Sequence, residues 1–149
     1  MATARHGTWR SNMNIKLTGT LAATGALKEK WKKAEEELSK EIYKTAVRTA
    51  ELAKRSIQSG SKTGKVYKKY NPNRTHRASA AGEAPANDTG ALVGSITQEH
   101  TSPLEAIVGS TINYSKFLEF GTTTIEERPF LRTALKQAGA EFEKNMLKR

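Results

Sequence analysis

An uninterrupted amphipathic pattern between Ala26 and Ile57 constrains the fold of this chain more than any other feature of its sequence. Apolar side chains recur there every three or four residues and charged side chains occupy the opposite face, as in a helix that packs by one side. No proline or glycine interrupts the pattern, and Ser59-Gly60 provides a stop. At 1.5 Å per residue, the predicted helix is about 45–50 Å long.

The composition of the apolar stripe bears on how this helix packs. The stripe consists of Leu27, Trp31, Ala34, Leu38, Ile42, Thr45, Ala46, Thr49, Ala53 and Ile57. A coiled coil is the alternative, but a zipper needs Leu and Ile where this stripe has Thr and Ala. The pattern therefore favours a helix packed within a domain.

Two alternating segments in the second half of the chain are typical of strands. Residues 95–100 and 104–110 favour the two strands of a hairpin, and Thr101-Ser102-Pro103 favours the turn between them. A similar alternation at Ile15–Leu21 predicts a short strand before the long helix.

The C-terminal region has the pattern of a second amphipathic helix. Arg128-Pro129-Phe130 marks its start, because proline favours the first helical position, and Glu126 and Glu127 suit the positive end of a helix. Its apolar face continues through residues 131–146. The sequence therefore predicts an α+β fold, with a long N-terminal helix and a C-terminal helix packed against a small antiparallel sheet.

The length of 149 residues fits one domain. Residues 1–13 are polar and are predicted to form a disordered tail, and residues 14–149 to form a single domain. Within that domain, residues 59–89 are rich in Gly, Ser, Asn, Pro, Lys and Arg, which predicts a long flexible basic loop without regular structure.

The charge of the chain is concentrated in and before this loop. The net charge is +10 in total, but residues 1–82 carry +12 and residues 83–149 carry −2. Such a basic segment favours an acidic partner or nucleic acid. The residues predicted to contact a partner or DNA are Lys62, Lys65, Tyr67, Lys68, Lys69, Tyr70, Arg74 and Arg77.

Aromatic residues cluster between the predicted sheet and the second helix. Tyr114, Phe117 and Phe120 lie within seven residues, and Phe130 opens the helix. Phe117, Phe120 and Phe130 are predicted to be core residues, and Gly121 to permit the turn after them. The segment before this cluster contains Asp88, which is predicted to cap a short turn that begins at Thr89.

No set of residues with catalytic spacing is present. The absence of cysteine excludes disulfides, thiol nucleophiles and Cys-containing metal sites. His6, His76 and His100 lack the spacing of metal ligands, and no phosphate-binding loop or nucleophile elbow occurs. Glu119 is predicted to be partly buried and paired with Arg128 or Arg132. We therefore expect no enzyme, cofactor, metal or small-molecule substrate, and no membrane-spanning segment.

Two blocks of sequence resemble one protein family. The first runs from Arg77 to Leu92 and ends in Asp-Thr-Gly-Ala-Leu, and the second contains Glu-Phe-Gly-Thr at residues 119–122 followed by Arg-Pro-Phe-Leu at 128–131. In this order they resemble the gene-product-ten-like neck proteins of long-tailed bacteriophages, which are also called head–tail joining or tail-completion proteins. The matching positions are Asp88, Thr89, Gly90, Leu92, Tyr114, Phe117, Glu119, Phe120, Gly121, Thr122, Arg128, Pro129 and Phe130.

The resemblance implies a structural virion protein rather than an enzyme. It implies a homo-oligomeric ring that joins the capsid connector to the tail around the DNA channel, assembled in the cytoplasm of the bacterial host. The implied partners are other copies of the chain and other neck, head-closure and tail-tube or terminator proteins. A non-specific basic DNA-binding module is the main alternative, and a small nuclease or toxin is a third.

Overall fold

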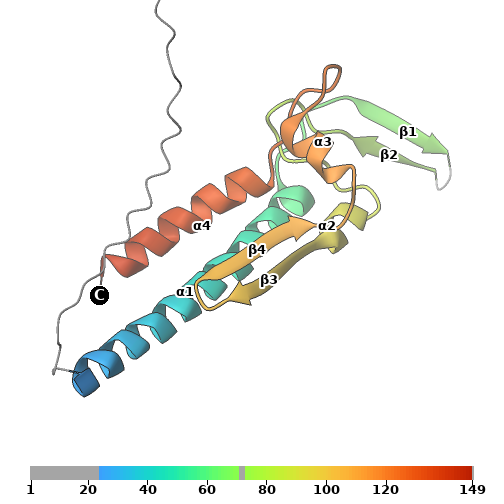
Figure 1. Cartoon of the computed structure of the whole chain (residues 1–149). Helices are drawn as coiled ribbons and strands as arrows, with labels where there is room; N and C mark the ends of the chain where they lie inside the picture. The colour runs from blue at the N-terminus through green and yellow to red at the C-terminus, as the bar shows by residue number, and fades with distance from the viewer. Residues whose placement is uncertain (1–23, 71–72, 149) are drawn as a thin grey trace, which may run out of the picture.

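The computed structural model describes residues 24–70 and 73–148 and has an α+β fold (Figure 1). The predicted tail at residues 1–13 and the predicted strand at Ile15–Leu21 lie outside the described residues. The elements in chain order are α1 (Thr24–Ser59), β1 (Val66–Tyr70), β2 (Asn73–Arg77), α2 (Ala91–Ser95), β3 (Ile96–Ser102), β4 (Glu105–Ser110), α3 (Ser115–Phe120) and α4 (Leu131–Met146).

The long helix α1 is the element on which α4 and the β3–β4 hairpin pack. Helix α4 and the hairpin β3–β4 both lie along α1, on neighbouring parts of its surface (Figure 1). The strands form two separate antiparallel pairs, β1–β2 and β3–β4, rather than one sheet. The predicted fold class is therefore confirmed, and both predicted helices and the predicted β3–β4 hairpin are present.

The core is concentrated at the C-terminal half of α1. It consists of Ala50, Leu52, Ala53, Ile57, Leu92, Ile96, Phe130, Ala134 and Ala138. Alanines on both α1 and α4 leave little side chain between the two helices, so their backbones approach closely. This explains why the apolar stripe of α1 has small residues where a zipper would have Leu.

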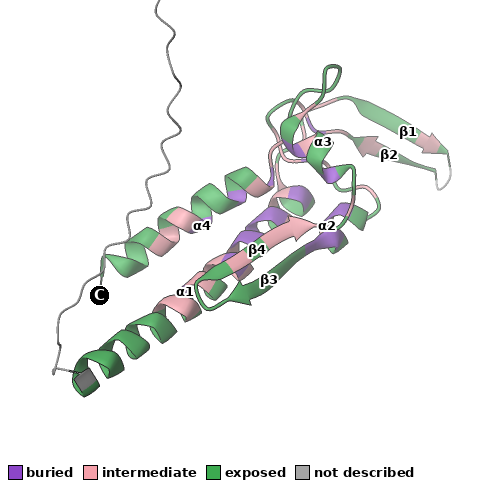
Figure 2. Ribbon diagram, in the orientation of Figure 1, coloured by how far each residue is buried: buried purple, intermediate pink, exposed green. Residues whose placement is uncertain are grey.

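The N-terminal half of α1 extends beyond the elements that cover the rest of the helix (Figure 2). Its stripe residues Leu27 and Trp31 are 40% and 69% exposed, although they continue the stripe that is buried further along. The prediction of a packed helix therefore holds for the C-terminal half only. The reason is length, because α1 has 36 residues and α4 only 16.

The prediction that residues 59–89 lack regular structure is wrong for residues 66–70 and 73–77, because β1 and β2 form an antiparallel hairpin there. Neither strand alternates apolar with polar residues, so the period-two signal of a strand is absent. Flexibility of residues 59–89 stays a prediction.

The aromatic cluster is buried less than the sequence indicates. Phe130 is fully buried, as predicted, but Phe117 and Phe120 are 48% and 68% exposed, so their assignment to the core is wrong. They lie in the short helix α3, which presents both rings outward. Gly121 ends α3 with a φ of 72°, and a Cβ there would lie 2.8 Å from the carbonyl oxygen of Ile125, which confirms its role in the turn.

The start of α4 also differs from the prediction. The helix begins at Leu131 with Phe130 at the N-cap, so Pro129 precedes the cap instead of occupying the first helical position. Among residues 24–70 and 73–148, no helix combines the length and apolar character needed to cross a bilayer.

Candidate functional site

The hairpin β1–β2 carries most of the predicted partner residues. Because side chains alternate across a strand, the cross-strand pair Lys69–Arg74 shares one face, and Lys68 opposite Thr75 shares the other. The two faces have different roles, since one is held to the body of the domain and the other is exposed.

Asp88 holds the first of these faces. Its carboxylate accepts hydrogen bonds from the ammonium of Lys69 and the guanidinium of Arg74, and the Nδ1 atom of His76 lies 3.9 Å away. The hydrogen bond from Lys69 is the main reason why the pKa of Asp88 is below its ordinary value. Lys69 and Arg74, which were predicted to contact a partner, therefore bind within the chain.

The prediction that Asp88 caps the following turn is wrong. The backbone N–H of Gly90 donates to Oδ1 of Asn87 at 3.0 Å, and the N–H of Ala91 donates to Thr89 Oγ1 at 3.4 Å. Gly90 itself has a φ of 82°, a conformation that favours glycine. Asn87 and Thr89 accept the hydrogen bonds of the turn, so the carboxylate of Asp88 is not needed as its cap.

Lys62 makes its hydrogen bonds within the chain. Its ammonium donates to the carbonyl oxygens of Ser56 at 3.2 Å, Ala84 at 2.9 Å and Pro85 at 3.0 Å. Burial lowers the pKa of Lys62, and the nearby Glu83 opposes this shift. The lysine thus joins the C-terminal end of α1 to the loop before α2, and its contact with a partner stays a prediction.

Glu83 closes the base of the hairpin. Its carboxylate accepts hydrogen bonds from the backbone N–H of Thr63 at 2.9 Å, from the hydroxyl of Thr63 at 2.8 Å and from the N–H of Ala80 at 2.8 Å. These donors, led by the N–H of Thr63, lower the pKa of Glu83 to about 2. The charged carboxylate therefore joins the segment that precedes β1, through Thr63, to the segment that follows β2, through Ala80.

The lowered pKa of Glu83 predicts a stability change in acid. Because the folded pKa is about 2 and the ordinary value is 4.5, the contribution of Glu83 is fully present above pH 4.5 and disappears as the pH falls towards 2. We expect the stability difference between the wild type and Glu83→Gln to shrink across this window in urea titrations. A Glu83 carboxyl that titrates near 4.5 by NMR would contradict this expectation.

The other predicted contact residues remain exposed. Among the described residues, Lys65, Lys68 and Arg77 have no ion pair, and Tyr70 is 84% exposed near the tip of the hairpin. Tyr67 is half exposed on the face that also carries Lys69. The structure thus divides the predicted cations into three that bind within the chain, Lys62, Lys69 and Arg74, and three that have no ion pair within the described part of it, Lys65, Lys68 and Arg77.

Glu119 is the main site residue whose role the sequence does not reveal. It is buried, and its carboxylate accepts hydrogen bonds from the backbone N–H groups of Phe130, Leu131 and Arg132 at 2.8, 3.0 and 2.8 Å. It therefore satisfies the free donors at the start of α4 and places a negative charge at the positive end of the helix. Glu126 and Glu127 were the carboxylates expected to suit this helix end.

The predicted arginine partner of Glu119 is Arg132, whose Nε donates to the carboxylate at 3.2 Å. Arg132 also binds Glu127 at 2.7 Å, and these hydrogen bonds raise its pKa. Arg128 instead donates to the carbonyl oxygen of Ser79 at 3.4 Å. Glu119 thus binds the helix start within the second of the two sequence blocks that resemble neck proteins, and the hydrogen bond from Arg128 to Ser79 joins this block to the first.

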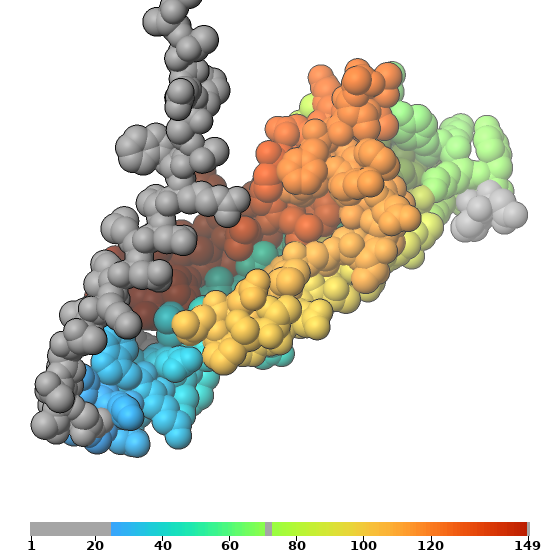
Figure 3. All heavy atoms as spheres, in the orientation of Figure 1, coloured from blue at the N-terminus to red at the C-terminus, as the bar shows by residue number. Residues whose placement is uncertain are grey.

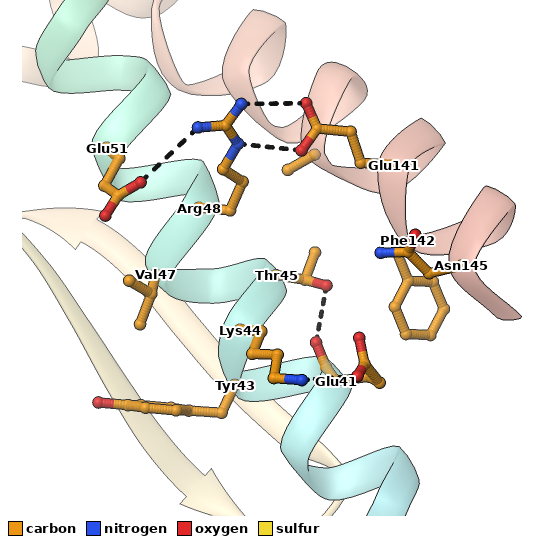
Figure 4. Close-up of a pocket in the computed structure, with 11 residues that line it drawn as sticks. Glu41, Tyr43, Lys44, Thr45, Val47, Arg48, Glu51, Glu141, Phe142 and Asn145 are labelled. Carbon is orange, nitrogen blue, oxygen red and sulfur yellow. Dashed lines mark hydrogen bonds and ion pairs between the residues drawn. The ribbon is translucent and has the colours of Figure 1, made fainter.

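A cavity of about 460 Å³ lies between α1 and α4, and its charged residues are paired (Figure 4). Arg48 of α1 donates to Glu141 of α4 at 2.9 Å and lies 3.7 Å from Glu51. The hydrogen bond between Arg48 and Glu141 lowers the pKa of this carboxyl and raises that of the guanidinium. Glu141 is therefore ionised at neutral pH and acts as a link between the helices rather than as a proton donor.

Comparison with family models, with curated proteins and with solved structures finds no match for this chain.

Proposed function

We propose that this chain is a structural component of the head–tail junction of a long-tailed bacteriophage, which assembles as a ring between the capsid connector and the tail. The single observation that carries the proposal is the contact between Glu119 and the start of α4. This contact gives the Glu-Phe-Gly-Thr and Arg-Pro-Phe-Leu motifs a shared physical role, because the glutamate of the first motif caps the helix that begins at the second.

The surface of the molecule is consistent with a protein that docks onto others. Leu27, Trp31 and Phe120 are large apolar residues that are 40–69% exposed, and the basic hairpin presents free cations. Leu27 and Trp31 lie one helical turn apart on α1, and exposed apolar side chains that lie close together mark surfaces that other proteins cover. In the proposed ring the hairpin faces the DNA channel or an adjoining neck protein.

The test is loss of the chain from the phage that encodes it. Without the gene product, we expect filled heads and free tails that fail to join, and the wild-type chain supplied in trans should restore joined, infectious particles. Electron microscopy of the lysate measures both states. Joined tailed particles in the absence of the chain would overturn the proposal.

A non-specific DNA-binding module is the second candidate, and the free cations of the hairpin favour it. Lys68 and Arg77 share one exposed face of β1–β2, and Lys65 directly precedes β1. A two-stranded ribbon is narrow enough for the major groove of DNA, and each phosphate that is neutralised makes binding more sensitive to salt.

This candidate gives a quantitative prediction. Replacing Lys65, Lys68 and Arg77 with serine should reduce the slope of log affinity for duplex DNA against log salt by about 2–3, because three phosphate contacts are lost. The matched control replaces the exposed Lys32, Lys33 and Lys40 of α1 with serine, which removes the same charge. Fluorescence anisotropy with labelled duplex measures both slopes, and equal slopes for the two variants would exclude the hairpin as a DNA contact.

A further inference from the structure

An apolar groove runs between α4 and β4, with α1 as its floor. Two adjoining cavities of about 190 and 350 Å³ form it, and both are lined by Thr49 of α1, Ala106 and Val108 of β4 and Leu135 of α4. The surface of α1 is visible between these two elements (Figure 3). Leu135 is 58% exposed, so no described part of the chain covers the groove.

The second unpartnered apolar surface is the stripe at the N-terminal end of α1. Leu27 and Trp31 are exposed, and Leu38 at the inner end of this stripe is only partly covered, by a surface that includes Leu104 of the β3–β4 turn. We infer that the groove of one copy binds this stripe, residues 27–38 of α1, from a second copy. This inference rests on the proposed function and names the surfaces through which copies of the chain meet.

The dimensions of the two surfaces agree. The stripe from Leu27 to Leu38 is about 16 Å long, and the wall of the groove from Leu131 to Phe142 on α4 has the same length, since both span eleven helical steps. An amphipathic helix that lays its apolar face in a groove between other elements is a common mode of recognition. The stripe and the groove therefore match in length and in apolar character.

The charges beside the two surfaces are also complementary. Glu35 borders the stripe next to Trp31, and Lys116 lines the end of the groove, where Arg132 and Glu119 are paired with each other. Opposite charges at the rim of an apolar contact fix its orientation and register more than they add to affinity. The stripe thus has a preferred direction in the groove.

The other apolar segment of this chain that is a candidate occupant is Ile15–Leu21. Extended chain spans at most about 3.3–3.6 Å per residue, so Ile15 reaches no more than about 30–32 Å from Thr24. On the floor of the groove, Ile42 lies about 27 Å from Thr24 along α1, and Thr45 and Thr49 lie about 32 and 38 Å away. The segment therefore reaches only the near end of the groove of its own chain, and a second copy is needed to fill the rest.

A contact between two different surfaces joins copies head to tail. The stripe leaves the first copy and enters the groove of the next, whose own stripe remains available for a third copy. Such heterologous contacts produce a ring when the rotation between copies closes. The same contact therefore accounts for the assembly of the proposed ring.

The absence of cysteine in the chain allows a direct test by crosslinking. One variant carries Trp31→Cys, a second carries Leu135→Cys, and the two full-length proteins are mixed and treated with a short bismaleimide. We expect a crosslinked heterodimer at a yield about tenfold above the control, because docking raises the local concentration of the two thiols. The control pairs Leu135→Cys with Lys33→Cys, which lies on the opposite side of α1 at the same level.

Three results would overturn the inference. Equal yields for the Trp31 and Lys33 variants would show that the stripe does not enter the groove. Absence of any crosslinked dimer at high protein concentration would do the same. A crosslink within one chain that carries both Leu17→Cys and Leu135→Cys would show that the N-terminal segment is the occupant.

The result is separable from the test of the proposed function. If particles need the chain but the stripe and groove do not crosslink, the ring forms through other surfaces and only the present inference fails. If the crosslink forms but particles assemble without the chain, the self-docking contact is correct and the assignment to the neck fails.

Discussion

Replacing Glu119 with alanine is expected to lower the free energy of unfolding by about 3–5 kcal/mol, a large share of the stability of a domain of this size. The substitution leaves three backbone N–H groups at the start of α4 without their acceptor, and it removes the buried partner of Arg132. Buried donors that lose their acceptor are costly because water does not replace it. Urea denaturation followed by circular dichroism measures the change.

Glu127→Ala is the matched control for this prediction. Glu127 also binds Arg132, at 2.7 Å, but its side chain is more than half exposed, so its loss should change the stability by no more than about 0.5 kcal/mol. If Glu119→Ala and Glu127→Ala unfold at the same urea concentration, the capping role of Glu119 is wrong.

The second large effect is expected for Phe130→Ala, at about 3–5 kcal/mol. Phe130 is fully buried in the core that α4 forms with the C-terminal half of α1, and the substitution leaves a cavity that the surrounding residues only partly fill. Phe120→Ala makes the same chemical change at a ring that is 68% exposed and should cost less than about 1 kcal/mol. Thermal and urea denaturation of both variants provide the comparison.

Comparing Phe120→Ala with Phe130→Ala also distinguishes an effect on folding from an effect on the contact between copies. Phe120 lines the groove between α4 and β4, so Phe120→Ala should retain the fold and weaken crosslinking between copies. Equal destabilisation by Phe120→Ala and Phe130→Ala would mean that α3 packs with Phe120 inward, contrary to the structure.

The helices and the β3–β4 hairpin are predictable from the sequence because their signals are local. The three-to-four spacing of α1 gives bounds within two residues of those observed, Thr24–Ser59, and two alternating segments indicate the strands of the hairpin. The turn predicted at residues 101–103 is observed at 103–104, because β3 extends to Ser102. Small residues in the stripe of α1 also indicate correctly that its C-terminal half packs within a domain. Such patterns depend on neighbouring residues alone.

The hairpin β1–β2 is not predictable in the same way. Its strands are polar on both faces, and its position depends on Asp88, which lies outside both strands. The same contact separates the cations that hold the hairpin from those that are exposed. A count of basic residues assigns all of them to a partner, because ion pairing between distant residues leaves no trace in local composition.

The capping role of Glu119 and the difference in burial between the aromatic residues could also not be predicted from local sequence patterns. A carboxylate eleven residues before Phe130 caps α4, whereas Glu126 and Glu127 are nearer in sequence and are exposed. The choice is made by the turn at Gly121, which reverses the chain between α3 and α4. The same turn decides that Phe130 enters the core and Phe120 does not.

Immunogold electron microscopy of purified particles, with an antibody against this chain, tests the central claim most directly. The account predicts gold at a single position on each particle, between the head and the tail. Gold distributed over the capsid or along the tail, or particles that carry none, would contradict it.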